Sequence, residues 1–258
     1  MINLVNASYK FSGQAGNNEF AIKNLSLMIE KGEFVSLIGS NGCGKSTVAM
    51  ILNGVYELDS GYLEVDGMRV VDKTDKINAR KKIAVIFQNP SEQLIAGSVE
   101  ADIAFTLENF GIEVKTIRER VDASLNLFNL NDVRSKHPGE LSGGEQQRVV
   151  LAGVWALQPD YIICDELTTY LDHYSTKSII NMLHDFTEKD GGVLFITQYP
   201  IETMNSDRLL IMKDGEIISE GKPEGILRDS EMLLKASHTV PYEIIFEELT
   251  KNYSGRGI

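Results

Sequence analysis

A glycine-rich segment, Gly39-Ser40-Asn41-Gly42-Cys43-Gly44-Lys45-Ser46-Thr47, contains the residue types that point most directly to chemistry. It follows an apolar run at residues 34–38 and precedes a helix-compatible run at residues 48–52, the strand–loop–helix order of a phosphate-binding loop. Glycines let several backbone N–H groups point at one anion, and the following helix directs its positive end there. Lys45 adds a mobile charge, and the Ser46 hydroxyl suits a magnesium ion. A glycine-rich turn with a chance lysine is the alternative, but the full match predicts a nucleoside triphosphate site.

A second glycine-bearing segment, Leu141-Ser142-Gly143-Gly144-Glu145-Gln146-Gln147-Arg148-Val149, opens a predicted helix. Ser142 and Glu145 fit a capping box, S-x-x-E, which is the purely structural interpretation. A cap alone would not call for two adjacent glycines. Glycine amides, a serine hydroxyl and a helix amino terminus all favour an anion. With a phosphate loop in the same chain, this segment resembles the signature sequence of the ABC ATPases.

Other motifs of that family occur in the expected order. Gln88 follows an apolar run at residues 83–87, where the family has its Q-loop glutamine, and Tyr161-Ile162-Ile163-Cys164-Asp165-Glu166 resembles the Walker B strand with its acidic end. The resemblance implies that Ser46, Gln88 and Asp165 hold Mg²⁺ and that Glu166 orients or deprotonates the attacking water. Paired acids at a strand end are otherwise often a solvated turn, but the preceding apolar run favours the catalytic interpretation.

The resemblance also implies how ATP is held. In this family two nucleotide-binding domains pack head to tail, and the phosphate loop of one faces the signature of the other. The signature of this chain would therefore serve the partner's ATP, and a monomer should bind nucleotide but hydrolyse it poorly. An aromatic residue should stack on adenine; Phe11 is the first candidate and Tyr9 the second, although either could be a core residue. The expected ATP contacts are Phe11, Gly39, Ser40, Asn41, Gly42, Cys43, Gly44, Lys45, Ser46, Thr47, Ser142, Gly143, Gly144, Glu145 and, in the D-loop, Asp172.

The chain departs from the family pattern near the expected catalytic residues Glu166, Gln198 and Gln88. Gln198 stands where the family usually has a histidine. Glutamine can donate a hydrogen bond but cannot titrate near neutral pH or carry a positive charge. Leu167 replaces a usual proline, and Tyr170 replaces a usual small residue. We hypothesise an asymmetric pair in which this chain's own phosphate loop lies in the slower site. The alternative is a homodimer in which glutamine works adequately.

Two segments resemble the ATPases of energy-coupling factor transporters. One is Gln88-Asn89-Pro90-Ser91-Glu92-Gln93; the other is the tail, where His238-Thr239-Val240-Pro241 precedes an amphipathic segment at residues 243–249. A terminal helix that only covers core surface is the alternative for the tail. The resemblance implies four things: a second ABC ATPase subunit, preferably a different chain; a transmembrane coupling protein; a small membrane protein that binds a vitamin or metal ion; and a peripheral location on the cytoplasmic face of the cell membrane. The rival functions are the ATPase of a conventional ABC importer and, less favoured, a soluble ABC ATPase acting on nucleic acid or ribosomes.

Composition limits these alternatives. The 258 residues include 25 Lys and Arg and 37 Asp and Glu, a net charge of −12, which argues against a general nucleic-acid surface. The longest apolar stretches are far shorter than the ~18 residues needed to span a bilayer. The amino terminus lacks the features of a secretory signal. The only two cysteines, Cys43 and Cys164, fit small buried thiols in a reducing compartment.

The periodicity of apolar residues predicts the elements that position these motifs. Residues 1 to about 87 are expected to form mainly strands, with a hairpin turn at Asp66-Gly67. Apolar spacing predicts helices after Ser98 and around residues 117–128, and buried strands at residues 161–164 and 193–197. The expected fold is α/β: an ABC-type P-loop ATPase with a mixed sheet core, an antiparallel β subdomain, a helical subdomain and a short C-terminal helical tail. The expected boundaries are 1–88 with 159–220 for the core, 89–158 for the helical signature subdomain and 221–258 for a dimerisation tail.

Overall fold

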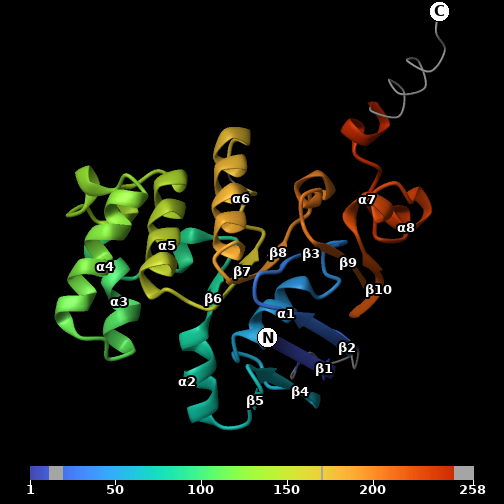
Figure 1. The fold of residues 1–258 in the computed structure, drawn as a ribbon, viewed down its shortest axis with the longest axis horizontal. Coiled ribbons are helices and arrows are strands. Elements are labelled where there is room, and N and C mark those ends of the chain that lie inside the picture. The colour runs from blue at the N-terminus through green and yellow to red at the C-terminus, as the bar shows by residue number, and fades with distance from the viewer. Residues whose placement is uncertain (12–19, 170, 247–258) are drawn as a thin grey trace, which may run out of the picture.

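The computed structural model describes residues 1–11, 20–169 and 171–246. Tyr170, one of the departures from the family pattern, and residues 247–258, the end of the expected tail, lie outside the described residues. The described chain forms two sheets with helices on one side and a C-terminal segment on the other (Figure 1).

The central sheet has six strands in the order β10-β9-β3-β8-β7-β6. Neighbouring strands from β6 to β9 run parallel, and β10 pairs antiparallel with β9, so the sheet is mixed as expected. The strands are β3 (Phe34–Gly39), β6 (Ile83–Ile86), β7 (Tyr161–Asp165), β8 (Gly192–Ile196), β9 (Arg208–Lys213) and β10 (Glu216–Gly221).

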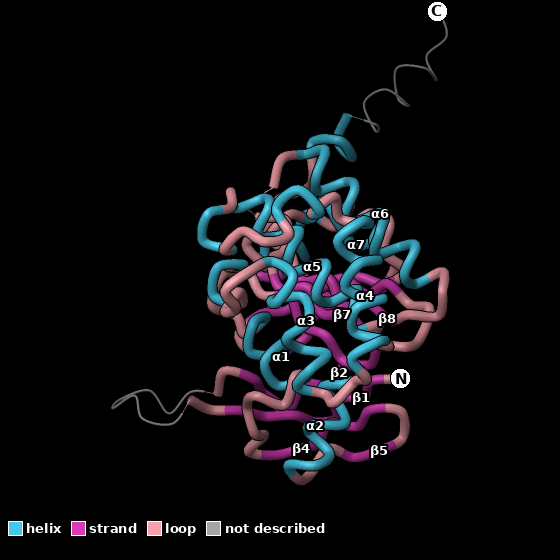
Figure 2. The backbone as a smooth tube through the Cα atoms, turned by 90° about the vertical axis from the view of Figure 1, so that its left-hand side faces the viewer, coloured by secondary structure: helices cyan, strands magenta, loops and turns pink. Residues whose placement is uncertain are grey.

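A second, antiparallel sheet lies as a separate layer below β7 and β8 in Figure 2. Its strand order is β2-β1-β4-β5. The expected turn at Asp66-Gly67 joins β4 and β5 and is confirmed, with both residues at positive φ. The strands are β1 (Ile2–Tyr9), β2 (Ile22–Ile29), β4 (Ser60–Val65) and β5 (Met68–Arg69).

Alternation along the central strands explains why both faces of the central sheet are covered. On β7, Ile162 and Cys164 pack in the core with the helices, whereas Tyr161 and Ile163 pack toward the antiparallel sheet. Such alternation follows from the twofold side-chain period of a strand. Helix α6 (His173–Thr187) contributes Ile179 and Leu183 to the core that Ile162 and Cys164 share with the helices. Helix α1 (Lys45–Leu52) packs in the other core, on the side of the antiparallel sheet.

Three helices form a group beside the central sheet, at the left of Figure 1. They are α3 (Val99–Asn109), α4 (Val114–Leu127) and α5 (Gly143–Leu157). Ser98 caps α3 by accepting a hydrogen bond from the Ala101 N–H, as its position predicts. Short 3₁₀ turns η1 (Pro90–Glu92), η2 (Asn131–Val133) and η3 (Pro138–Glu140) connect this group.

The expectation that residues 1 to about 87 are mainly strands missed one helix, α2 (Lys73–Lys82). Only Ala79 of this helix is buried, so it has no apolar stripe for periodicity to detect. Its start is fixed instead by a capping box between Asp72 and Asp75.

The C-terminal segment packs on the outer side of the sheet. It comprises α7 (Pro223–Ile226) and α8 (Ser230–Lys235), and residues 242–246 are helical. Leu227, Leu233 and Ile244 form a small core with Ile38, the residue of β3 that precedes the glycine-rich loop. The described part of the tail therefore packs against β3, the strand that leads into the glycine-rich loop.

Candidate ATP site

The glycine-rich loop connects the carboxyl end of β3 with α1. Gly44 is the N-cap of α1 with φ 112°, a conformation that favours glycine. A Cβ at Gly44 would lie 2.6 Å from the Ala21 carbonyl oxygen, and one at Gly39 would lie 2.2 Å from the Met212 carbonyl oxygen. Glycine is therefore required at both positions by the surrounding backbone.

Lys45 is folded into the loop. Its side chain is only 4% exposed, and Nζ donates hydrogen bonds to the Gly39 carbonyl at 2.7 Å and the Ser40 carbonyl at 3.2 Å. Nζ also lies 4.0 Å from Glu166 Oε1. A cation held by carbonyls at the start of a helix makes this loop a favourable place for an anion.

An open cavity of about 460 Å³ lies over the loop. Segments far apart in the sequence meet there, and Gly39, Ser40 and Cys43 are not among its lining residues. Cys43 is buried in the core, and Cys164 is buried in β7, as expected for structural thiols. The lining residues are Phe11, Ala21, Asn41, Gly42, Gly44, Lys45, Ser46, Thr47, Gln88, Glu166 and Gln198.

The two candidate aromatics differ in their surroundings. Phe11 is 48% exposed and lines the cavity. Tyr9 stacks on Tyr56 with ring centroids 4.8 Å apart and packs against the core under the antiparallel sheet. Phe11 meets both tyrosines edge-on. The geometry favours Phe11 as the ring available to a planar base.

Asp165 and Glu166 stand at the carboxyl end of β7. Glu166 has φ 54°, an uncommon conformation for a residue with a side chain that often marks functional sites. Glu166 Oε2 accepts a 2.6 Å hydrogen bond from Gln198 Nε2. Gln198, which we expected to stand in place of a histidine, is thus in contact with the expected catalytic carboxylate.

The donor set around Asp165 fits Mg²⁺ bound together with a phosphate. Asp165 Oδ1 is buried without a hydrogen-bond partner among the described residues. Burial raises the pKa of Asp165, a hydrogen bond from Ser46 lowers it, and the charge of Glu166 raises it further. The described residues contain no cluster of three or more His, Cys, Asp or Glu that could hold a metal alone. Mg²⁺ typically uses one or two carboxylates with substrate phosphates and water.

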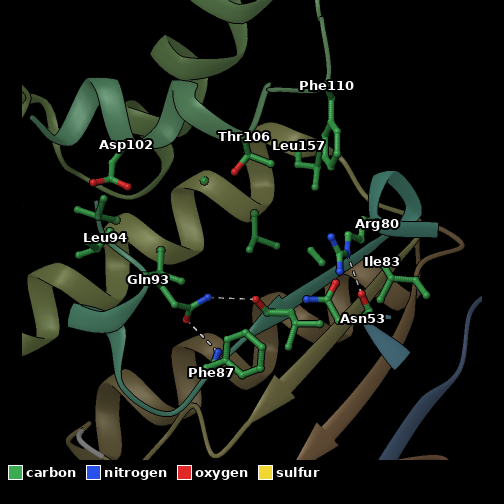
Figure 3. Close-up of a pocket in the computed structure, with 16 residues that line it drawn as sticks. Asn53, Arg80, Ile83, Phe87, Gln93, Leu94, Asp102, Thr106, Phe110 and Leu157 are labelled. Atoms are coloured by element: carbon green, nitrogen blue, oxygen red, sulfur yellow. Dashed lines mark hydrogen bonds between the residues drawn. The ribbon is translucent and has the colours of Figure 1, made fainter. Parts of the chain in front are cut away.

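Gln93 holds the loop that carries Gln88, a role that sequence reasoning did not assign. Its Oε1 accepts from the Phe87 N–H at 2.9 Å and its Nε2 donates to the Val85 carbonyl at 3.2 Å (Figure 3). The side-chain amide thereby extends the edge strand β6. It also lines a groove of about 280 Å³ between β6 and the helices, together with Asn53, Arg80, Asp102, Thr106 and Phe110.

The predicted signature residues lie away from this cavity. Ser142 N-caps α5, and its hydroxyl and N–H both donate to Glu145 Oε2, at 2.7 and 2.9 Å. The capping box is therefore present. Gly143 and Gly144 are exposed, and Ser142, Gly144 and Glu145 line a separate cavity of about 580 Å³. Asp172 lines the same cavity and N-caps α6 by accepting from the Tyr174 and Ser175 N–H groups.

Comparison with known proteins shows which family has this sequence. The model of the ABC transporter family matches residues 22–169. The energy-coupling factor transporter ATP-binding protein EcfA of Pediococcus pentosaceus is 38% identical over 97% of this chain and 89% of its own length. The corresponding EcfA1 of Ligilactobacillus salivarius is 39% identical, over 97% of this chain and 88% of its own length.

Solved structures agree with the sequence relatives. The dimeric ATP-binding cassette MJ0796, in a post-hydrolysis state with ADP and Pi, superposes with a TM-score of 0.79 at 28% identity, covering 86% of this chain and 99% of the other. The cbiO1 protein from Clostridium perfringens, described as part of the ABC transporter complex cbiONQ, gives 0.75 at 28% identity, covering 96% and 98%. The expected fold class is thereby confirmed, and the chain belongs to the ABC transporter family, among the ATP-binding proteins of energy-coupling factor transporters.

Proposed function

We propose that this chain is the ATP-hydrolysing subunit of an energy-coupling factor importer of a vitamin or metal ion, bound peripherally at the cytoplasmic face of the cell membrane. The observation that supports ATP hydrolysis most strongly is the single cavity in which the glycine-rich loop, Gln88, Glu166 and Gln198 come together. The choice of transporter class rests on the relatives. No helix in the described part of the chain is long and apolar enough to cross a membrane.

The residues divide the reaction between binding and chemistry. The loop amides and Lys45 bind the phosphates, and Phe11 stacks on the base. Ser46, Asp165 and Gln88 would hold Mg²⁺, which neutralises charge on the phosphates. Glu166 orients the water that attacks the γ-phosphorus and accepts its proton, while Gln198 donates to the same region. The products are ADP and inorganic phosphate.

The site is completed by a second ATPase subunit, for which a different chain is favoured over a copy of this one. The cavity over the loop is open, and the exposed signature lies outside it. Ser142, Gly143, Gly144 and Asp172 would therefore contact nucleotide bound to the partner. ATP closes the pair, and hydrolysis releases it.

The groove beside Gln93 is the proposed docking site for the transmembrane coupling protein. It lies between β6 and the helical group (Figure 3), and the loop from Gln88 to Gln93 joins it to the ATP cavity. Closure of the ATPase pair would therefore move the coupling protein, which in turn acts on the small substrate-binding membrane protein.

Replacing the usual histidine with Gln198 predicts slow hydrolysis in this chain's own pocket. Removing one transition-state hydrogen-bond donor costs about 10²–10³-fold in other enzymes, and the observed contact with Glu166 would soften that loss. Single-turnover hydrolysis by the purified complex, with Glu166→Gln in this subunit alone, tests the asymmetry. If activity falls as far as when the partner's glutamate is replaced, the two pockets are equivalent and the asymmetric scheme is wrong.

Affinity purification of the full chain from native membranes tests the proposed function as a whole. We expect a second ATPase, a coupling protein and a small membrane protein to copurify, and the complex should hydrolyse ATP. Lys45→Ala should abolish the share of that hydrolysis that occurs in this chain's own pocket. Copurification with a conventional pair of large permease subunits would support an ordinary ABC importer instead. Recovery with ribosomes or DNA would reject transport.

A further inference from the structure

Glu202 joins the two segments that carry the catalytic pair. It lies in the 3₁₀ turn η4 (Pro200–Thr203), four residues after Gln198. Its Oε2 accepts a 2.9 Å hydrogen bond from the Thr168 hydroxyl and a 2.6 Å hydrogen bond from the Thr197 hydroxyl. Thr168 follows Glu166 by two residues and Thr197 directly precedes Gln198. One carboxylate oxygen therefore ties together the segments after β7 and β8.

These contacts close a ring of interactions. From Glu166 the chain leads to Thr168, then by hydrogen bonds through Glu202 to Thr197, and along the chain to Gln198. The Gln198 amide returns to Glu166 at 2.6 Å. Without the Glu202 contact with Thr168, the hydrogen bond from Gln198 to Glu166 would be the only side-chain link of the ring between the two segments.

The two threonines of the ring are buried, and backbone hydrogen bonds flank the ring. Thr168 and Thr197 are 3% and 1% exposed. The Glu166 N–H donates to the Ile196 carbonyl at 2.9 Å, and the Tyr199 N–H donates to the Thr197 hydroxyl oxygen at 3.1 Å. Burial raises the pKa of Glu202 against the two hydroxyl bonds, which lower it. Burying a carboxylate costs free energy, which the two hydroxyl hydrogen bonds partly offset. An ordinary exposed turn residue would have neither the burial nor these bonds.

We propose that Glu202 is a positioning residue that sets the distance and direction between Glu166 and Gln198 for ATP hydrolysis. It touches neither the cavity over the phosphate loop nor Lys45, so it acts on the chemical step and leaves nucleotide binding unchanged. The inference rests on the proposed function, because it assigns Glu166 and Gln198 to hydrolysis.

The test compares variants that differ by one hydrogen-bonding group. Because the partner's pocket is the faster one in the proposed scheme, hydrolysis is measured in a complex whose partner subunit carries Gln in place of its own catalytic glutamate. In Glu202→Ala both bonds are lost, and we expect the remaining kcat to fall about 10- to 100-fold, the cost of a small misplacement of reacting groups, with KM for ATP unchanged. In Glu202→Gln the remaining carbonyl oxygen can accept both hydroxyls, so kcat should stay within about threefold of wild type. Thr168→Val and Thr197→Val should each lower kcat, whereas Thr168→Ser and Thr197→Ser keep the hydroxyl and should restore it.

Thr203→Val is the matched structural control. The Thr203 hydroxyl donates to the Pro200 carbonyl at 2.7 Å within the same turn, so its loss weakens η4 without touching the ring. Thr203→Val should lower the Tm and leave kcat unchanged. Hydrogen exchange gives a readout that needs no ATP: the Glu166 and Tyr199 amides should exchange faster in Glu202→Ala than in Thr203→Val.

The outcomes separate this inference from the proposed function. If the wild-type complex does not hydrolyse ATP, the proposed function fails. If it does, and Glu202→Ala keeps its kcat or loses kcat only in proportion to Tm as Thr203→Val does, Glu202 has no positioning role. Equal damage in Glu202→Gln and Glu202→Ala would also overturn the inference, because one acceptor oxygen would then not suffice. Should Glu202→Ala not fold, the threonine pairs decide the question.

Discussion

Two helices of this chain begin with glycine-bearing segments, and the surroundings of the two differ. At the phosphate loop, a Cβ on Gly44 would lie within 3 Å of Ala21, Ile22 and Met212 atoms. At the start of α5, a Cβ on Gly143 or Gly144 would meet no described atom within 4 Å other than those of its chain neighbours and its own helix backbone. The first glycine is required by the packing of this chain. Nothing in the described chain requires the other two, which is what a surface shaped for another molecule would show.

The polar groups of the two segments are also used differently. Lys45 is buried and bonded within its loop, next to a cavity that several other segments help to line. Ser142 and Glu145 are bonded to each other on the surface of α5. The phosphate loop is therefore built into the core of this chain. The start of α5 is exposed, and in the proposed function it meets the nucleotide bound to the partner subunit.

Gly44→Ala should have the largest effect on the folded chain. An alanine at position 44 would have to adopt φ 112°, and its Cβ would lie 2.6 Å from the Ala21 carbonyl oxygen. The free energy of unfolding should therefore fall by about 2–5 kcal/mol. Binding of a fluorescent ATP analogue should be lost with it. Gly42→Ala is the control, since Gly42 also has positive φ but no described atom within 4 Å of its Cβ. A Gly44→Ala chain as stable as Gly42→Ala would contradict this account of the loop.

Gly144→Ala should have the opposite effect: the fold should stay stable while ATP hydrolysis is lost. Alanine is the better helix former by about 0.5–1 kcal/mol, so the Tm should stay the same or rise. ATP hydrolysis by the assembled complex should fall roughly 100-fold, because a methyl group would displace the facing nucleotide. Gly225→Ala in α7, which also has no described atom within 4 Å of its Cβ, should leave hydrolysis unchanged. If Gly144→Ala retained full activity, α5 would not face a nucleotide.

The sequence predicted most of the elements because their signals are local. The continuous apolar run of β7 reflects burial on both faces of the sheet, and the spacing of Val99, Ile103 and Leu107 reflects burial on one face of a helix. The Asp66-Gly67 turn needs only its own two residues. Helix α2 was not predicted because only one of its ten residues, Ala79, is buried, so the sequence shows no apolar periodicity there. Its capping box at Asp72 was the available signal.

The links that hold the site together could not be predicted in the same way. Gln93 bonds backbone groups of β6 that its own loop must turn back to reach, and Glu202 bonds Thr168, which comes close only when the carboxyl ends of β7 and β8 lie side by side. For Glu202, the fourth position after Gln198 carries no pattern of its own. The motifs predict which side chains react, whereas the contacts that hold those side chains depend on the tertiary fold.

Ser142 separates a capping role from a ligand role. Ser142→Ala removes the cap and should cost about 1 kcal/mol of unfolding free energy. Ser142→Asp can still accept from the Glu145 N–H, so it should restore stability, but its charge would repel a partner's phosphate and hydrolysis should stay low. Ser98→Asp at the start of α3 is the control, because Ser98 also caps its helix through one N–H. Full activity in Ser142→Asp would reduce Ser142 to a cap.

The smallest expected effect is a pH dependence of the same cap. Hydrogen bonds from the Ser142 hydroxyl and N–H lower the pKa of Glu145 below its ordinary value. A carboxylate whose pKa is lower in the folded state stabilises the fold above the unfolded pKa, and that contribution disappears as the pH falls through the folded value. The Tm difference between wild type and Glu145→Gln should therefore be positive at pH 7 and vanish in acid. A Tm difference independent of pH would mean that the Glu145 charge does not stabilise the capping box. The start of α5 would then not be held by its own polar side chains in the way that the phosphate loop is held by Lys45.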